Sequence, residues 1–171
     1  WQPSLQIIPH YESEPLYIQA IVNSINHKLS NINWKPDLIL ASYHGIPKKY
    51  FDKGDPYHCY CQKTSRLIKE MFNKNIPILT TFQSRFGPQE WLQPYTDKTL
   101  ESLPKEGKKN VLVISPGFSS DCVETLEEIS IQGKESFLEA GGEKFDTIPC
   151  LNDNEDHIKL LVHLINKSIK K

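Results

Sequence analysis

The sequence predicts an α/β fold, a doubly wound parallel sheet of about four strands with helices on both faces. Two observations support this fold class. Three short apolar runs have the length of strands in a parallel sheet, the first of them nearly continuous like a strand buried on both faces, and residues 144–149 form a weaker fourth. Segments with apolar residues at helical spacing come before, between and after these runs. Such alternation is typical of proteins in which each helix connects two parallel strands.

The elements follow from these patterns in order. The first helix is expected over residues 14–29, and the clearest strand is the continuous apolar run at 110–115. Gly141-Gly142 should end the longest helix, since glycine favours the conformation that closes a helix. The expected strands are 37–43, 76–82, 110–115 and 144–149, and the expected helices after the first are 57–72, 96–103, 121–140 and 157–169.

Length and charge limit the classes of function. The chain has 171 residues, of which 38% are apolar, so we expect a single α/β domain over residues 1–171. Twenty basic and 21 acidic residues give a net charge of -1, whereas a nucleic-acid-binding domain shows a basic excess. No apolar run approaches the roughly 18 residues of a membrane span. The chain starts at Trp1 and its only methionine is Met71, so we expect a fragment of a longer protein.

The cysteines indicate a reducing compartment. Four cysteines in a chain of this size are too few for a disulfide scaffold, so we expect reduced thiols and a cytoplasmic protein. His58, Cys59 and Cys61 invite a metal-site interpretation, but residues two apart on a helix point to nearly opposite sides. Cys122 and Cys150 are expected to be small buried residues.

Function is expected at one edge of the sheet, because ligands of open α/β sheets bind outside the carboxyl ends of the strands. Three segments follow strands and carry reactive or charged side chains: 42–47, 83–88 and 116–124. In the first, His44 stands before a Gly-x-Pro turn. Histidine can exchange protons near neutral pH or bind a metal. The alternative is that His44 only ties down a loop by hydrogen bonds.

Carboxylates begin the helix expected after the third strand. Glu124 and Glu128 are four residues apart and should share one helix face, where they could pass on a divalent cation or share protons. The alternative is structural: Asp121 and Glu124 have the spacing of a capping box. After the second strand, Arg85 suits a carboxylate partner, although it could equally form an ordinary surface ion pair.

Four blocks of sequence carry a specific likeness. They are Ser42-Tyr43-His44-Gly45-Ile46-Pro47, Gly54-Asp55-Pro56-Tyr57, the stretch from Thr81 to Asp97 that contains Gln83-Ser84-Arg85 and Trp91, and Pro116 to Glu128 with Ser119 and Cys122-Val123-Glu124-Thr125-Leu126. Together, and in this order, they resemble the C-terminal half of ferrochelatase, over nearly the whole chain. Family enzymes consist of two similar α/β lobes with a porphyrin in the cleft between them, so this chain resembles the second lobe, without the N-terminal lobe.

The resemblance implies a reaction and residue roles. Ferrochelatase, a lyase of haem and porphyrin biosynthesis, inserts Fe²⁺ into a porphyrin, with protoporphyrin IX as the expected substrate. The family's histidine and glutamate fall on His44 and Glu124, which are the expected catalytic residues for deprotonating pyrroles and delivering metal. His44, Glu124 and Glu128 are the expected metal ligands. The residues expected to line the substrate cleft are Ser42, Tyr43, Gln83, Ser84, Arg85, Trp91 and Ser119.

The resemblance also implies partners and absences. Porphyrin, Fe²⁺ and the N-terminal lobe are the expected partners, with possible peripheral membrane contact of the full enzyme. Iron is substrate, no cofactor is bound permanently, and no [2Fe–2S] cluster is expected because the four cysteines do not match the pattern of cluster-bearing members. The fragment alone should be inactive. Alternatives are a non-catalytic half that binds porphyrin or metal, and a related chelatase for cobalt or nickel.

Overall fold

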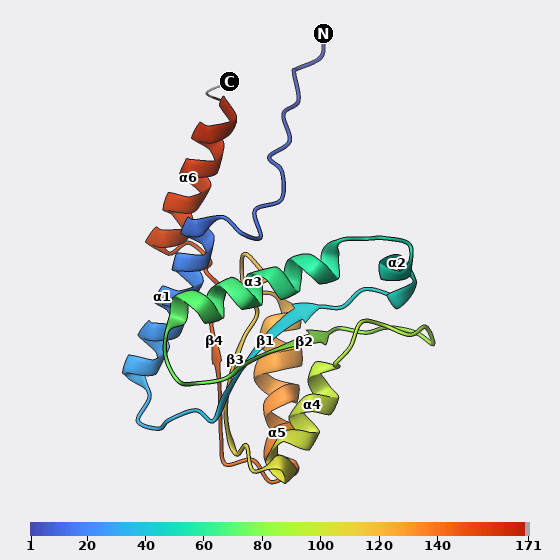
Figure 1. Ribbon diagram of the computed structural model, residues 1–171, viewed down its shortest axis with the longest axis vertical. Helices are drawn as coiled ribbons and strands as arrows, with labels where there is room; N and C mark the ends of the chain where they lie inside the picture. The colour runs from blue at the N-terminus through green and yellow to red at the C-terminus, as the bar shows by residue number, and fades with distance from the viewer. Residues whose placement is uncertain (170–171) are drawn as a thin grey trace.

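A four-stranded, all-parallel sheet forms the centre of the molecule, with the strand order β2-β1-β3-β4 (Figure 1). The computed structural model describes residues 1–169, and the last two residues of the expected domain lie outside the described part. The strands are β1 (Leu38–His44), β2 (Ile78–Gln83), β3 (Asn110–Ile114) and β4 (Lys144–Ile148). The α/β fold class expected from the sequence is confirmed, with each strand where an apolar run predicts one.

Helices cover both faces of the sheet, as doubly wound topology requires. One apolar core joins the sheet to α1 (Pro15–Asn31), α3 (Tyr57–Phe72) and α6 (Glu155–Ile169). A second core joins the opposite face to α4 (Thr96–Ser102), η1 (Leu103–Glu106), η2 (Glu124–Gly133) and α5 (Lys134–Glu139). Side chains of β1 alternate between the two cores, with Ile39 and Ala41 in the first and Leu38 and Leu40 in the second.

Two local features differ from the expected elements. A short helix, α2 (Lys48–Asp52), occupies the loop after β1, where proline and glycine obscure a single helical turn. The helix expected over 121–140 begins three residues later, and its first ten residues form a π-helix, η2, which continues into α5. A π-helix bonds residue i to residue i+5, and such segments are frequent at functional sites. Apolar spacing does not distinguish it from an α-helix over so short a segment.

Within residues 1–169, no helix combines the length and apolar character that crossing a membrane requires. α6 and the extended N-terminal residues project beyond the sheet and run out in the same direction (Figure 1).

Candidate functional site

The site is built where β1 and β2 end side by side. Their parallel register places His44 opposite Gln83, the last residue of each strand. The backbone continues this pairing for one more residue, since Gly45 N–H donates to the Gln83 carbonyl at 2.8 Å. A Cβ on Gly45 would lie 2.9 Å from that carbonyl oxygen and 3.2 Å from the Trp91 ring, so glycine is needed for this close approach. The register thus brings the first two predicted segments together.

His44 has one ring nitrogen engaged and one available. Its Nδ1 lies 2.6 Å from the Gly45 carbonyl oxygen, which can only accept, so the neutral ring carries its proton on Nδ1. Nε2 then keeps a lone pair for a proton or a metal ion. The rings of Trp91 and Phe118 flank the imidazole, with centroids 6.4 and 6.3 Å away. Tyr57 fixes the strand end by donating to the His44 carbonyl at 2.8 Å.

Glu124 presents an ionised carboxylate near this histidine. Its pKa lies below the usual range because the Cys122 side chain and its own backbone N–H hydrogen-bond the carboxylate, and because His44 is close enough to interact with its charge. Glu124 opens η2, whose first turn faces the strand ends. The structure therefore brings together His44 and Glu124, the two predicted catalytic residues, at the carboxyl edge of the sheet.

The capping-box interpretation of Asp121 and Glu124 is wrong. No side chain caps η2, which is preceded by Val123 in a helical conformation. Asp121 instead ties the loop to the segment after β4: its carboxylate accepts from the Cys150 N–H at 3.2 Å and from Asn152 Nδ2 at 2.7 Å. These hydrogen bonds lower the pKa of Asp121 although partial burial opposes ionisation. Glu124 is thereby left without a structural role in capping.

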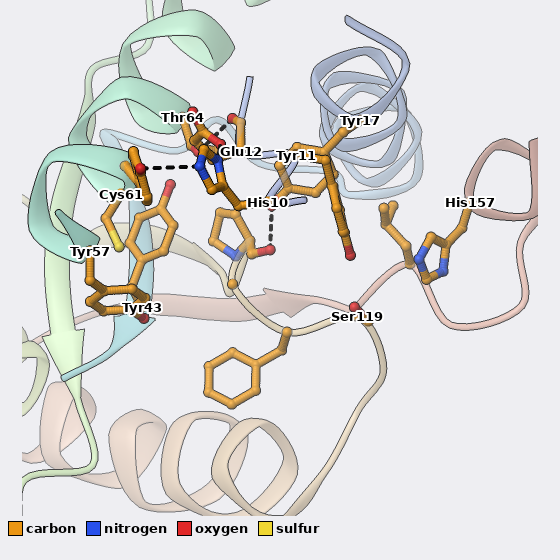
Figure 2. A pocket seen from close by; sticks show the side chains of 15 residues that line it. His10, Tyr11, Glu12, Tyr17, Tyr43, Tyr57, Cys61, Thr64, Ser119 and His157 are labelled. Carbon is orange, nitrogen blue, oxygen red and sulfur yellow. Dashed lines mark hydrogen bonds and ion pairs between the residues drawn. The ribbon is translucent and has the colours of Figure 1, made fainter. Parts of the chain in front are cut away.

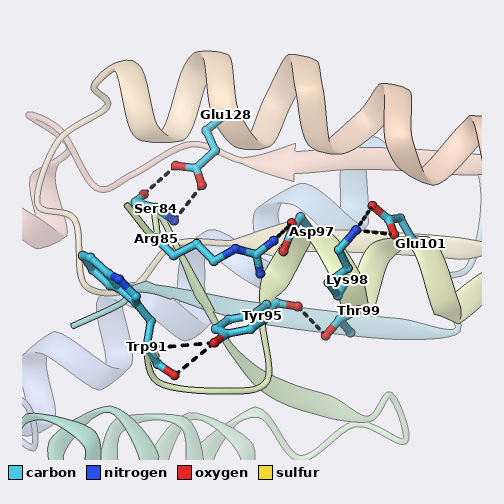
Figure 3. A network of polar contacts seen from close by, with 9 residues as sticks. All are labelled: Ser84, Arg85, Trp91, Tyr95, Asp97, Lys98, Thr99, Glu101 and Glu128. Atoms are coloured by element: carbon cyan, nitrogen blue, oxygen red, sulfur yellow. Dashed lines mark hydrogen bonds and ion pairs between the residues drawn. The ribbon is translucent and has the colours of Figure 1, made fainter. Parts of the chain in front are cut away.

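Glu128 has local partners of its own. Its carboxylate accepts from Ser84 N at 2.7 Å, from Ser84 Oγ at 2.5 Å and from Gln83 Nε2 at 3.3 Å; the two Ser84 hydrogen bonds are drawn in Figure 3. Ser84 has a φ of 63°, in the left-handed region that serine rarely adopts. Glu128 therefore holds Ser84 in this conformation and clamps η2 to the end of β2. This distinguishes it from Glu124, whose carboxylate interacts with Cys122 and with the charge of His44.

Gln83 connects the sheet to the first turn of η2. Its Nε2 donates to the Glu124 carbonyl at 2.7 Å, and its Oε1 accepts from Ser42 Oγ at 2.8 Å. Ser42 is fully buried, and a further hydrogen bond of 2.8 Å joins it to the Thr96 hydroxyl. Ser42 and Gln83 are thus buried, and their hydrogen bonds orient the backbone of Glu124. Thr96, which sequence reasoning did not select, belongs to this support.

Arg85 and Trp91 stand on the outer side of the network in Figure 3. Arg85 Nη2 donates to Asp97 at 2.6 Å, and its guanidinium lies 4.3 Å from the centre of the Tyr95 ring. Trp91 is held by its indole N–H, which donates to the Phe86 carbonyl at 2.9 Å. The Arg85 ion pair matches the structural alternative weighed for this residue, and both partners are partly exposed.

Tyr43 and Ser119 line a separate cavity of about 240 Å³, shown in Figure 2. Because strand side chains alternate, Tyr43 points to the face opposite Ser42, where burial raises the pKa of its hydroxyl above the usual range. Its hydroxyl pairs with Ser65 at 3.0 Å. Phe118 borders this cavity and also flanks His44.

Metal-ligating groups do not gather into a preformed cluster. Among residues 1–169, no three His, Cys, Asp or Glu side chains are arranged to hold an ion together. His44 and Glu124 lie at the same edge of the sheet, whereas the oxygens of Glu128 are taken by Ser84 and Gln83. Cys59 is exposed and Cys61 buried, as expected from their spacing on α3. Cys150 is buried as expected, but Cys122 is only partly so.

Comparison with known proteins identifies the family. The ferrochelatase family model matches residues 1–169. Curated relatives include ferrochelatases of Rhizobium meliloti (strain 1021), 55% identical, and Agrobacterium fabrum (strain C58 / ATCC 33970), 48% identical. Each alignment covers 99% of this chain and 50% of the relative, so the chain spans about half the length of the curated relatives it matches. This chain, with His44 and Glu124 at the same edge of the sheet, belongs to the ferrochelatase family.

Proposed function

We propose that residues 1–171 are the second half of an enzyme that inserts ferrous iron into a porphyrin, with protoporphyrin IX as the substrate and haem as the product. The reaction places Fe²⁺ on four pyrrole nitrogens and releases two protons from the macrocycle. The observation that carries the proposal is that one edge of the sheet holds both a histidine with an available Nε2 and an ionised carboxylate. Gln83 links the two, since it pairs with His44 in the sheet and donates to the Glu124 carbonyl at 2.7 Å.

His44 is proposed to accept pyrrole protons. Its Nδ1 is engaged with the Gly45 carbonyl, so the lone pair on Nε2 is the group that can take a proton from a bound macrocycle. A base that titrates near neutral pH can also release each proton to water afterwards. The flanking rings of Trp91 and Phe118 offer apolar surfaces against which a flat macrocycle can lie.

Glu124 is proposed to bring in the metal ion. Hard carboxylate oxygens suit Fe²⁺ and can replace its water ligands stepwise. A lowered pKa keeps the Glu124 carboxylate ionised at neutral pH, ready to bind a cation. Glu128 is proposed as a second metal ligand one helical turn further along, and it can serve only if it releases a donor at Ser84 or Gln83. Either of the two glutamates then delivers iron toward the face on which His44 lies.

Iron is substrate in this proposal, and no resident cofactor or iron–sulfur cluster takes part. The remaining polar residues, Ser84, Arg85 and Ser119, are proposed to face the macrocycle or its carboxylates, with Arg85 exchanging Asp97 for a substrate carboxylate. All four cysteines are free thiols, in accord with a cytoplasmic location. The isolated half should be inactive, because catalysis requires both reactants to be held in one geometry.

The test uses a two-half chain, in which residues 1–171 follow the first half of the Rhizobium meliloti ferrochelatase. Fe²⁺ is supplied anaerobically, and metallation is followed as loss of porphyrin fluorescence. We expect turnover by the two-half chain and none by residues 1–171 alone. A folded two-half chain that binds porphyrin without metallating it would indicate a non-catalytic binding half. Faster insertion of Co²⁺ or Ni²⁺ than of Fe²⁺ would indicate a different chelatase.

A further inference from the structure

The last helix carries more apolar surface than the fold covers. One face of α6 packs on the core through His157, Leu160 and Leu164, which are buried. Next to that face lies a second row of apolar side chains, 37–68% exposed. We call this row the α6 stripe; it consists of Ile158, Leu161, Val162, Ile165 and Ile169. At about 100° per residue the stripe spans about 100° of the helix circumference beside the buried face.

A second exposed apolar segment accompanies the stripe. The extended N-terminal residues run out beside α6, and both project beyond the sheet (Figure 1). Gln6 Nε2 donates to the Ser168 carbonyl at 2.6 Å, which ties the segment to the last turn of α6. Leu5 and Ile7 on this segment are 86% and 79% exposed. Together they form an apolar surface that nothing in residues 1–169 covers, and such surfaces mark interaction sites.

The charge of α6 favours a protein over a membrane as the occupant. A helix that lies on a lipid surface carries a polar face rich in lysine and arginine. The polar residues of α6 include two acids, Glu155 and Asp156, and two lysines, Lys159 and Lys167. Both lysines are already paired with acids, Lys159 with Glu155 and Lys167 with Glu14. Within residues 155–169, α6 therefore offers no cationic face to anionic lipid.

We infer that the α6 stripe and residues 5–8 are the surface on which the other half of the enzyme packs. The curated relatives are twice as long as this chain, so a partner of comparable size belongs to the same protein. This inference rests on the proposed function in one respect, that the chain acts as one half of a two-half ferrochelatase. The other half then covers a helix that would otherwise expose five large apolar side chains to water.

The experiment measures burial of the stripe directly. Ile165→Cys is made in residues 1–171 and in the two-half chain, and its rate of labelling by a thiol reagent is read by peptide mass spectrometry. Ile131→Cys is the matched control, since Ile131 is a helical isoleucine of similar exposure, 54% against 47% for Ile165. We expect labelling at position 165 to slow at least tenfold in the two-half chain, and labelling at position 131 to stay unchanged.

Equal labelling rates at position 165 in both proteins would overturn the inference. So would slow labelling in residues 1–171 alone accompanied by a dimer in sedimentation, because a second copy would then be the occupant. Protection only on addition of anionic vesicles would assign the stripe to a membrane and also overturn it. Metallation is measured in the same two-half chain. If the two-half chain metallates porphyrin but position 165 labels as fast as before, the inferred docking surface is wrong and the proposed function stands. If position 165 is protected from labelling but no metallation occurs, the proposed function is wrong and the docking surface stands.

Discussion

The buried support beneath Glu124 can be tested by removing one hydroxyl. Ser42 is 0% exposed, and its Oγ donates to Gln83 Oε1 at 2.8 Å. Ser42→Ala removes this donor without adding any atom, so no clash arises. Gln83 is itself buried, and water cannot readily reach its oxygen to replace the lost donor. The substitution therefore leaves a buried acceptor without a partner.

The expected cost follows from that unpaired acceptor. Leaving a buried polar group unsatisfied costs about 1–3 kcal/mol. For a domain of this size, with a urea dependence of about 2 kcal/mol/M, a loss of about 2 kcal/mol lowers the urea midpoint by about 1 M. Urea unfolding followed by tryptophan fluorescence measures this shift, because Trp34 and Trp91 lie in the folded domain.

A matched control separates this effect from the loss of any serine. Ser120 is exposed, so Ser120→Ala should change the free energy of unfolding by less than about 0.5 kcal/mol. If Ser42→Ala proves as stable as Ser120→Ala, the hydroxyl does not support Gln83 and the reasoning is refuted. If the destabilisation is seen, the same variant in the two-half chain should also lower the rate of metallation, because Gln83 orients the first turn of η2.

Three other changes test separate parts of the structure. Burial opposes ionisation of Glu12, but hydrogen bonds from Lys63 and His10 lower its pKa from 4.5 to about 2. The Glu12 carboxylate therefore contributes fully to the free energy of unfolding above pH 4.5, and this contribution is lost as the pH falls through 2. Glu12→Gln should therefore cost about 1 kcal/mol at pH 6 and progressively less as the pH falls from 4.5 to 2, and a constant difference would contradict this. Gly45→Ala should destabilise by about 1–3 kcal/mol in thermal unfolding, because the added Cβ meets the backbone oxygen of Gln83; an unchanged melting temperature would show that the strands separate easily. Glu128→Ala should lower the free energy of unfolding in urea by about 2 kcal/mol, because the backbone and hydroxyl donors of Ser84 both lose their acceptor. Glu128→Gln keeps an acceptor oxygen and should lower it less. Equal decreases in the two variants would mean that the charge of Glu128, and not its hydrogen bonds, stabilises the protein.

The fold could be predicted from the sequence because the two central strands, β1 and β3, are mostly apolar and buried. Every residue of β1 from Leu38 to Tyr43 is buried, and a strand buried on both faces cannot be mistaken for a half-exposed one. The π-helix at Glu124 could not be predicted in this way. A π-helix differs from an α-helix in its main-chain hydrogen bonds. The spacing of apolar side chains over only ten residues does not reveal that difference.

The candidate site was predictable to the level of segments, but the role of each side chain depends on its partners. The rule for parallel sheets predicts that His44 and Glu124 meet at the carboxyl edge. Whether a polar residue faces solvent or supports a neighbour is decided by strand alternation and by contacts distant in sequence. Ser42 and Thr96 are 54 residues apart and meet only in the folded chain. No local pattern distinguishes Glu128, whose carboxylate holds Ser84, from Glu124, whose carboxylate has no bond to Ser84 or Gln83.

The most direct test of the account is a double-mutant cycle on metallation by the two-half chain. His44→Ala and Glu124→Gln are measured singly and together, with His27→Ala as a control histidine that is exposed on α1. Loss of a general base is expected to slow the reaction by about 10²–10⁴-fold. Residues that act as a unit give non-additive losses, so the double variant should be no slower than the worse single variant. Fluorescence traces in which either single variant keeps the rate of His27→Ala would contradict the claim that these two side chains act together on the porphyrin.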